Sequence, residues 1–89
     1  MRQEKEQIIK TAFRALALKT RERLDLTQKE MADRLDMCER SYFDIEAGNT
    51  KCGTLTVLLL LMELEDPLTF LLELKIAFDA EYERQMAAV

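Results

Sequence analysis

The sequence predicts an all-α protein, in which five helices form one small orthogonal bundle. The 89 residues include only two glycines and one proline, and 48% of them are hydrophobic. Such a composition favours helices and can supply a buried core. Apolar residues also recur at three- and four-residue steps along most of the chain. The connections between these periodic stretches are short, so we expect a single domain over residues 1–89.

The first two predicted helices lie in residues 3–35. The first covers roughly residues 3–24 and is interrupted at Asp25. A short second helix follows Thr27, which is a good N-cap, and Glu30 completes a capping box. It stops near Asp36, where a tight turn requires a residue that tolerates the left-handed backbone. The apolar positions of the first helix repeat with helical spacing: Ile8, Ile9, Ala12, Phe13, Leu16, Ala17 and Leu24.

The third predicted helix runs from about Cys38 to Ala47, and Gly48 ends it. Its inward positions are Met37, Tyr42 and Ile45. The outward positions follow one another as a continuous stripe along the helix. They are Glu39, Arg40, Phe43, Asp44 and Ala47.

Two further helices are predicted after a polar loop at residues 49–53. The fourth is marked by the apolar positions Leu55, Leu58, Leu59 and Met62. The fifth opens at Asp66 and Pro67, which are suited to the N-cap and the first helical position, and continues to about residue 86.

The distribution of charge limits where an anionic partner can bind. The formal net charge is −4, and residues 54–89 hold seven acidic against two basic side chains. Residues 1–18 have a net charge of +2. We therefore expect any anionic ligand to meet the first 53 residues, whereas the acidic C-terminal half could dock a basic protein.

Several classes of protein are disfavoured by the sequence. The longest apolar run, Val57–Met62, is too short to cross a bilayer, and the charged N-terminus does not look like a secretory signal. Cys38 and Cys52 suggest reduced thiols, so we expect a cytoplasmic protein. The chain has no histidine and no glycine-rich phosphate loop, and we expect no enzymatic activity, no cofactor and no metal. A redox role for Cys38, at a helix start, is the alternative to simple packing.

The capping-box helix, the turn and the striped helix together form a helix-turn-helix pattern over residues 27–47. The stretches LTQKEMADRL (26–35), DMCERSYFDIEAG (36–48) and LLLLMEL (58–64) resemble the lambda-repressor-like, XRE/Cro-type DNA-binding domain. The resemblance covers roughly residues 8–72. It implies a prokaryotic or phage transcriptional regulator that binds operator DNA as a homodimer through residues 38–47.

The resemblance also implies roles for individual residues. The candidates for contact with DNA bases are Gln28, Glu39, Arg40, Phe43 and Asp44. The candidates for contact with phosphates are Lys19, Arg23, Lys29 and Lys51. Arg21 and Glu46 match a largely buried salt bridge between the first and third helices.

Some of these assignments have plainer alternatives. Arg40 could donate to guanine or pair with Asp44 in solvent, and Phe43 could contact a thymine methyl group or fold over the turn. The chain departs from the family pattern at Asp25 and Asp36, where glycine is common. Because Glu39 and Asp44 place two carboxylates on the presumed reading face, a protein-interaction module, antitoxin-like or adaptor, is the alternative function.

The helix predicted at residues 67–86 has more apolar side chains than one small bundle needs. Either it packs fully across the bundle, or a second subunit covers part of it. Because helix-turn-helix proteins commonly act as dimers, we expect a homodimer through this helix. The interface residues expected are Leu71, Leu74, Phe78 and Tyr82.

Overall fold

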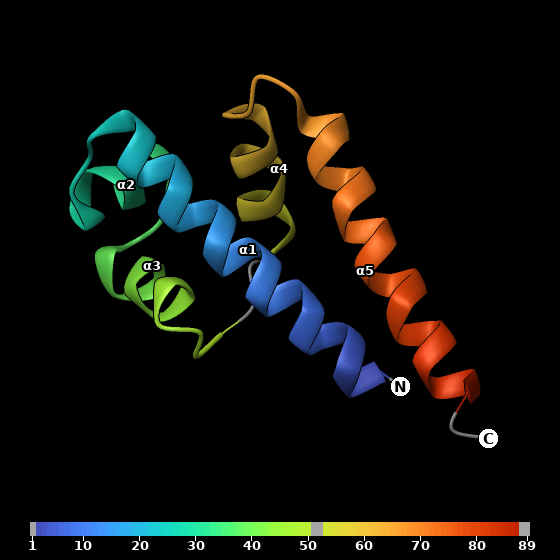
Figure 1. Cartoon of the computed structure of the whole chain (residues 1–89). Helices are drawn as coiled ribbons and strands as arrows, with labels where there is room; N and C mark the ends of the chain where they lie inside the picture. Colours follow the sequence, from blue (N-terminus) through green and yellow to red (C-terminus); the bar gives the residue numbers. More distant parts are fainter. Residues whose placement is uncertain (1, 51–52, 88–89) are drawn as a thin grey trace.

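The computed structural model describes residues 2–50 and 53–87 of the chain (Figure 1). Within these residues the protein is all-α, with five helices and no strand. The predicted class and order of elements are therefore confirmed. The helices are α1 (Arg2–Leu24), α2 (Gln28–Arg34), α3 (Glu39–Glu46), α4 (Thr54–Met62) and α5 (Pro67–Ala87).

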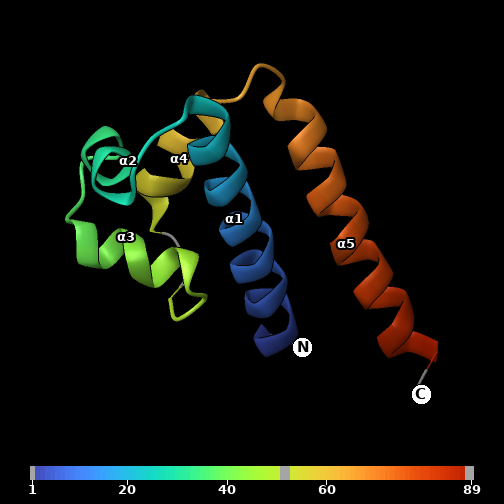
Figure 2. The same cartoon turned by 60° about the vertical axis from the view of Figure 1, so that its left-hand side comes forward.

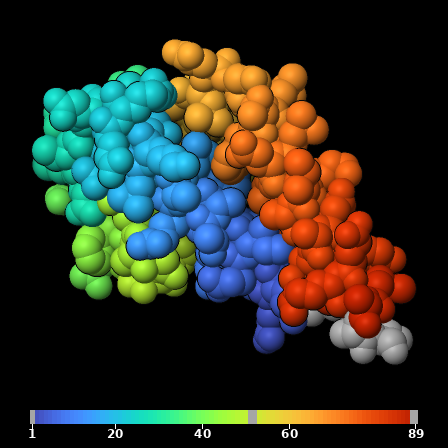
Figure 3. Space-filling view, in the orientation of Figure 1, coloured from blue at the N-terminus to red at the C-terminus, as the bar shows by residue number. Residues whose placement is uncertain are grey.

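Helix α1 is the centre of the arrangement. It contacts α3, α4 and α5, while α2 packs mainly against α3 (Figures 1 and 2). Helix α5 lies along α1 on the side away from α2 and α3, and its C-terminal part forms one end of the molecule (Figure 3). The buried apolar core is formed by Phe13, Leu16, Ala17, Met31, Ala32, Leu35, Tyr42, Ile45 and Leu60.

The capping signals predicted from the sequence are present at α2 and α5. The Thr27 hydroxyl accepts a hydrogen bond from the Glu30 backbone nitrogen at 3.1 Å, and the Thr27 nitrogen donates to the Glu30 carboxylate at 2.9 Å. At α5, the Asp66 carboxylate accepts from the Thr69 nitrogen at 3.3 Å. These side chains satisfy backbone donors that a helix start leaves without partners.

Among residues 2–50 and 53–87, three turn residues adopt the left-handed backbone. Asp25 and Asp36 have φ values of 57° and 56°, and Gly48 has a φ of 79°. The left-handed turn predicted at Asp36 is thus confirmed. The two aspartates lie on either side of α2. A residue with a Cβ meets a steric cost of about 1–2 kcal/mol in the left-handed backbone conformation, and this cost is smaller for aspartate.

We expect Gly48→Ala to lower the free energy of unfolding by about 1 kcal/mol, because alanine is strained at positive φ. Urea denaturation followed by circular dichroism measures the change. Gly48→Asn is the matched control, since asparagine tolerates a positive φ better than alanine does. Equal destabilisation by the two substitutions would contradict this explanation.

Within the part of the chain that the structure describes, helix α5 packs against the bundle through one face. Phe70 and Leu74 pack against the core, and the Phe70 ring meets Phe13 edge-on with centroids 5.2 Å apart. Leu74, which was predicted at a dimer interface, is half-buried against the core, so the bundle already covers part of its side chain. Phe78 is half-buried, whereas Leu71 and Tyr82 are exposed.

None of the helices within the described residues is long and apolar enough to cross a membrane.

Candidate nucleic-acid interface

Helix α3 presents its polar side to solvent because its apolar side is fixed in the core. Tyr42 and Ile45 are buried, and Met37, just before the helix, packs against the same core. These inward positions are as predicted. Of the outward positions, Glu39, Arg40, Phe43 and Ala47 are exposed and Asp44 is half-buried.

A shallow depression at the α2–α3 surface brings four of the predicted base-contact residues together. It measures about 470 Å³ and is lined by Gln28, Glu39, Arg40 and Phe43. The Arg40 guanidinium carbon lies 5.8 Å from the Phe43 ring centroid, within the range of a cation–π contact. Asp44 lies beside this group, because its Oδ1 atom is 3.6 Å from the Nε atom of Arg40. The Arg40 side chain is nevertheless 82% exposed, so this pair is weak and leaves the guanidinium available.

An ion pair below this surface fixes α3 against α1. Arg21 donates from Nε and Nη2 to the two carboxylate oxygens of Glu46, at 2.7 and 3.1 Å. Its Nη1 donates to the Leu26 carbonyl at 3.1 Å, and Gln28 Nε2 donates to Glu46 Oε1 at 3.0 Å. The Glu46 side chain is only 5% exposed. One buried carboxylate therefore ties together α1, α2 and α3.

The protonation states of this cluster follow from burial and hydrogen bonding. Burial raises the pKa of Glu46, but the hydrogen bonds from Arg21 and Gln28 outweigh it and hold that pKa below the ordinary value. The hydrogen bond to Glu46 raises the pKa of Arg21. Burial also raises the pKa of Tyr42, whose hydroxyl donates to the Ala17 carbonyl at 3.4 Å. The pair is thus ionised and the tyrosine neutral at neutral pH.

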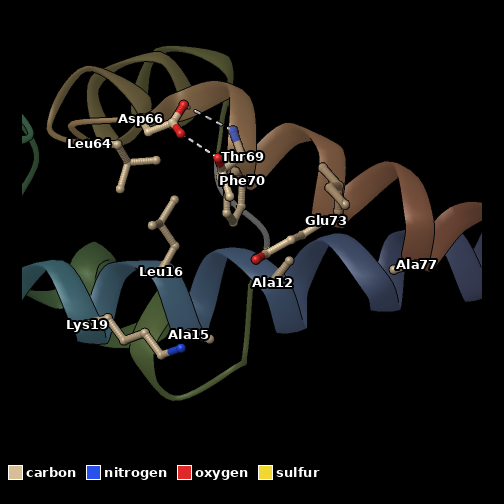
Figure 4. Close-up of a pocket in the computed structure, with 11 residues that line it drawn as sticks. Ala12, Ala15, Leu16, Lys19, Leu64, Asp66, Thr69, Phe70, Glu73 and Ala77 are labelled. Carbon is tan, nitrogen blue, oxygen red and sulfur yellow. Dashed lines mark hydrogen bonds between the residues drawn. The ribbon is translucent and has the colours of Figure 1, made fainter.

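The predicted phosphate-contact residues do not share one face. Lys29, on α2, is exposed and its Nζ lies 3.4 Å from Asp33 Oδ2. Lys19 instead lines a groove between α1 and α5 (Figure 4). Arg23 donates to the Glu63 carbonyl at 2.7 Å, which ties α1 to the end of α4. Lys19 and Arg23 therefore point away from α3, so the phosphate contacts predicted for these two residues would lie outside the α2–α3 surface. Lys51 lies outside the described residues.

Two basic residues on α1 lie beside α3 but were not predicted there. Arg14 Nε donates to the Glu46 carbonyl at 2.6 Å, at the C-terminal end of α3. Lys10 and Arg14 line a polar depression together with Ala47 and Gly48. In the sequence, the net charge of +2 over residues 1–18 was the feature that indicated basic residues in this part of the chain. They supply positive charge at one end of the α3 surface.

Cys38 is at the N-cap position of α3 and its side chain makes no capping hydrogen bond. Its exposed Sγ lies 3.1 Å from the Ser41 hydroxyl, and this hydrogen bond is the main reason that the thiol pKa lies below its ordinary value. Cys52 lies outside the described residues. In residues 2–50 and 53–87, no three cysteine, aspartate or glutamate side chains are placed to hold a metal ion.

Comparisons of the chain with protein-family models, with curated proteins and with solved structures gave no match. The functional interpretation therefore depends on the residues of the α2–α3 surface and their geometry.

Proposed function

We propose that the chain is a sequence-specific DNA-binding transcriptional regulator of the lambda-repressor-like (XRE/Cro) type. In this proposal α2 and α3 form the helix-turn-helix, α3 enters the major groove, and a homodimer binds operator DNA. The observation that supports it best is the fixed orientation of α3. The Arg21–Glu46 pair holds the helix from below, so that Arg40 and Phe43 extend from the opposite side into solvent.

Each residue of the surface has a distinct role in this proposal. Arg40 donates two hydrogen bonds to guanine O6 and N7, and Phe43 contacts a thymine methyl group. Glu39 accepts a hydrogen bond from cytosine N4. Gln28 acts as a positioning residue through its amide nitrogen, because that nitrogen already donates to Glu46. The mechanism is occupation of the operator without chemical reaction.

The decisive experiment is selection of binding sequences from a random pool of double-stranded DNA. We expect one motif to be enriched at low salt and to remain enriched, with lower yield, at physiological salt. The motif should contain a guanine that is essential for binding, as the target of Arg40. If no sequence is enriched in either condition, the proposal is wrong.

We expect Arg40→Ala to weaken binding to the selected motif by about 1–3 kcal/mol, which is roughly 5- to 150-fold, and to relax the preference at one base pair. Fluorescence anisotropy with matched and guanine-substituted DNA measures both effects. Arg84→Ala is the control, because Arg84 is also exposed and pairs with a carboxylate on its own helix, but lies on α5. A similar loss with Arg84→Ala would indicate a general charge effect rather than base recognition.

Lys29 and Lys19 give a matched test of the phosphate contacts. Lys29→Ala should weaken binding to all sequences alike and reduce the slope of log K against log salt by about 1. Lys19→Ala removes the same charge from the groove between α1 and α5 and should leave the slope unchanged. Titrations at four salt concentrations would distinguish the two variants. Equal slopes for both variants would contradict the placement of DNA on the α2–α3 surface.

A second candidate function is a protein-interaction module on the same fold. It is favoured by the acidity of residues 54–89 and by exposed apolar side chains on α4, namely Leu55, Leu58 and Met62. Point mutations on different helices would distinguish the two functions. A DNA-binding regulator loses its activity on Arg40→Ala, whereas an interaction module responds to changes on α4 and α5 only.

A further inference from the structure

The exposed side of α5 carries a heptad pattern. Its six positions are spaced four, three, four, three and four residues apart, which is the spacing of the a and d positions of a coiled coil. We call these positions the α5 seam, and their exposed fractions are 57–70%. Phe70 and Leu74 lie on the opposite side of the helix, against the core. The α5 seam consists of Leu68, Leu72, Lys75, Asp79, Tyr82 and Met86.

We propose that a second copy of this chain packs its own α5 antiparallel against the α5 seam, with the twofold axis at the level of Ala77. This deepens the homodimer of the proposed function and rests on it. In this register each a position faces a d position of the second copy, as antiparallel packing requires. The facing pairs are Leu68 with Met86 of the second copy, Leu72 with its Tyr82, and Lys75 with its Asp79.

The two charged positions determine the orientation. A parallel, in-register pair would place Lys75 opposite lysine and Asp79 opposite aspartate, and like charges facing each other are repulsive. The antiparallel register places each lysine opposite an aspartate. Within one chain Lys75 Nζ is already 2.8 Å from Asp79 Oδ2, so the dimer would join two such pairs into a ring of four charges.

Side chains beside the seam fit the same axis. Ile76 lies on one side of the seam and Phe78 on the other, both within one residue of Ala77. When two chains pair about this axis, Ile76 meets Ile76 of the second copy and Phe78 meets Phe78 of the second copy. Ile76 is exposed in the single chain, and Phe78 borders a shallow depression with Lys5 and Tyr82. Pairing would therefore cover two apolar side chains beside the central charges.

The accessible surface area of the single chain is also consistent with a second copy bound to the α5 seam. The accessible surface is 6315 Å², whereas a compact monomer of 10.4 kDa is expected to expose ~5,400 Å². The excess is close to the ~800 Å² that each partner buries in a standard protein–protein interface. The seam holds one lysine and one aspartate, so it is neutral. Such a seam suits self-pairing better than capture of a strongly basic protein.

Sedimentation equilibrium without DNA tests the register through two single substitutions. The wild-type chain should dimerise. Lys75→Asp gives four acidic groups at the centre of the homodimer and Asp79→Lys gives four basic groups, so each variant should dimerise at least about tenfold more weakly. An equimolar mixture should form heterodimers, because acidic and basic centres then face each other. Both positions are exposed, so circular dichroism should show unchanged helix content.

Three outcomes would overturn the proposal. They are a monomeric wild-type chain at every concentration, single variants that dimerise as well as the wild type, or a mixture that does not recover dimers. Because no DNA is present, any of them would leave the recognition role of α3 to be judged separately by the selection experiment. Conversely, a dimer that enriches no DNA sequence would refute the DNA-binding proposal and leave the pairing of α5 in place.

Cysteine cross-linking tests the orientation. In a background with Cys38→Ser and Cys52→Ser, a chain carrying Leu72→Cys is mixed with one carrying Tyr82→Cys and mildly oxidised. The antiparallel register predicts a disulfide-linked dimer in the mixture and little in either variant alone. Efficient cross-linking of each variant with itself would instead demonstrate parallel pairing and contradict the assignment.

Discussion

Replacement of Glu46 by alanine is expected to lower the free energy of unfolding by about 3–5 kcal/mol. The substitution removes the acceptor of three hydrogen bonds donated by Arg21 and Gln28. It leaves the guanidinium of Arg21, whose side chain is only 23% exposed, without its counter-charge. Because a domain of this size is stable by roughly 5–13 kcal/mol, the variant should be close to the limit of folding.

Urea denaturation at neutral pH measures this loss, and Glu22→Ala is the matched control. Glu22 is an exposed glutamate on α1, so its removal should change the stability by less than about 0.5 kcal/mol. Comparable losses in the two variants would show that the Arg21–Glu46 pair has no special role in stability.

The contribution of Glu46 should also depend on pH in a definite direction. Its pKa in the folded state lies below the ordinary value of 4.5. The stabilisation is therefore fully present above that ordinary value and is lost as the pH falls through the folded-state pKa. The difference in stability between the wild type and Glu46→Ala should thus shrink between about pH 6 and about pH 3. A constant difference would mean that the carboxylate charge does not matter.

Tyr42→Ala is expected to destabilise the protein by about 3–5 kcal/mol, because it removes a fully buried aromatic ring from the α3 side of the core. Tyr42→Phe keeps the ring and loses only the 3.4 Å hydrogen bond to Ala17, so it should cost about 0.5–1.5 kcal/mol. Thermal unfolding by differential scanning calorimetry measures both changes.

An aromatic residue next to Tyr42 provides the control. Phe43 follows it on α3 but is 44% exposed, so Phe43→Ala should cost less than about 1 kcal/mol. A larger effect at Phe43 than at Tyr42 would contradict the assignment of inward and outward positions on α3. The stability of Phe43→Ala would also allow its DNA binding to be measured without loss of the fold.

The helices could be predicted because their signals are local. The capping box of Thr27 and Glu30, the Asp66–Pro67 start of α5 and the left-handed Asp36 each depend on a few adjacent residues. The side of α5 that contacts α1 was harder to predict, since apolar residues occur around the whole helix. Leu74 and Leu72 look alike in sequence, and only the position of α1 makes one half-buried and the other exposed.

Which basic residues of α1 lie near α3 depends in the same way on position around the helix. Lys19 and Arg23 are close to Arg21 in sequence but lie on the other side of α1. Arg14 and Lys10 are separated from Arg21 by helical spacings of seven and eleven residues, so they share its side of α1. Because Arg21 binds Glu46 of α3, this spacing places Lys10 and Arg14 beside α3 as well.

The contacts of Arg21 have a consequence for how the protein opens. Its guanidinium binds the Leu26 carbonyl ahead of α2 and the Glu46 carboxylate of α3 at the same time. Helix α2 has only seven residues and would not persist alone in water. It therefore cannot detach without breaking the same cluster that holds α3. In native-state hydrogen exchange, the amides of α2 and α3 should then share one opening free energy and exchange as a single cooperative unit.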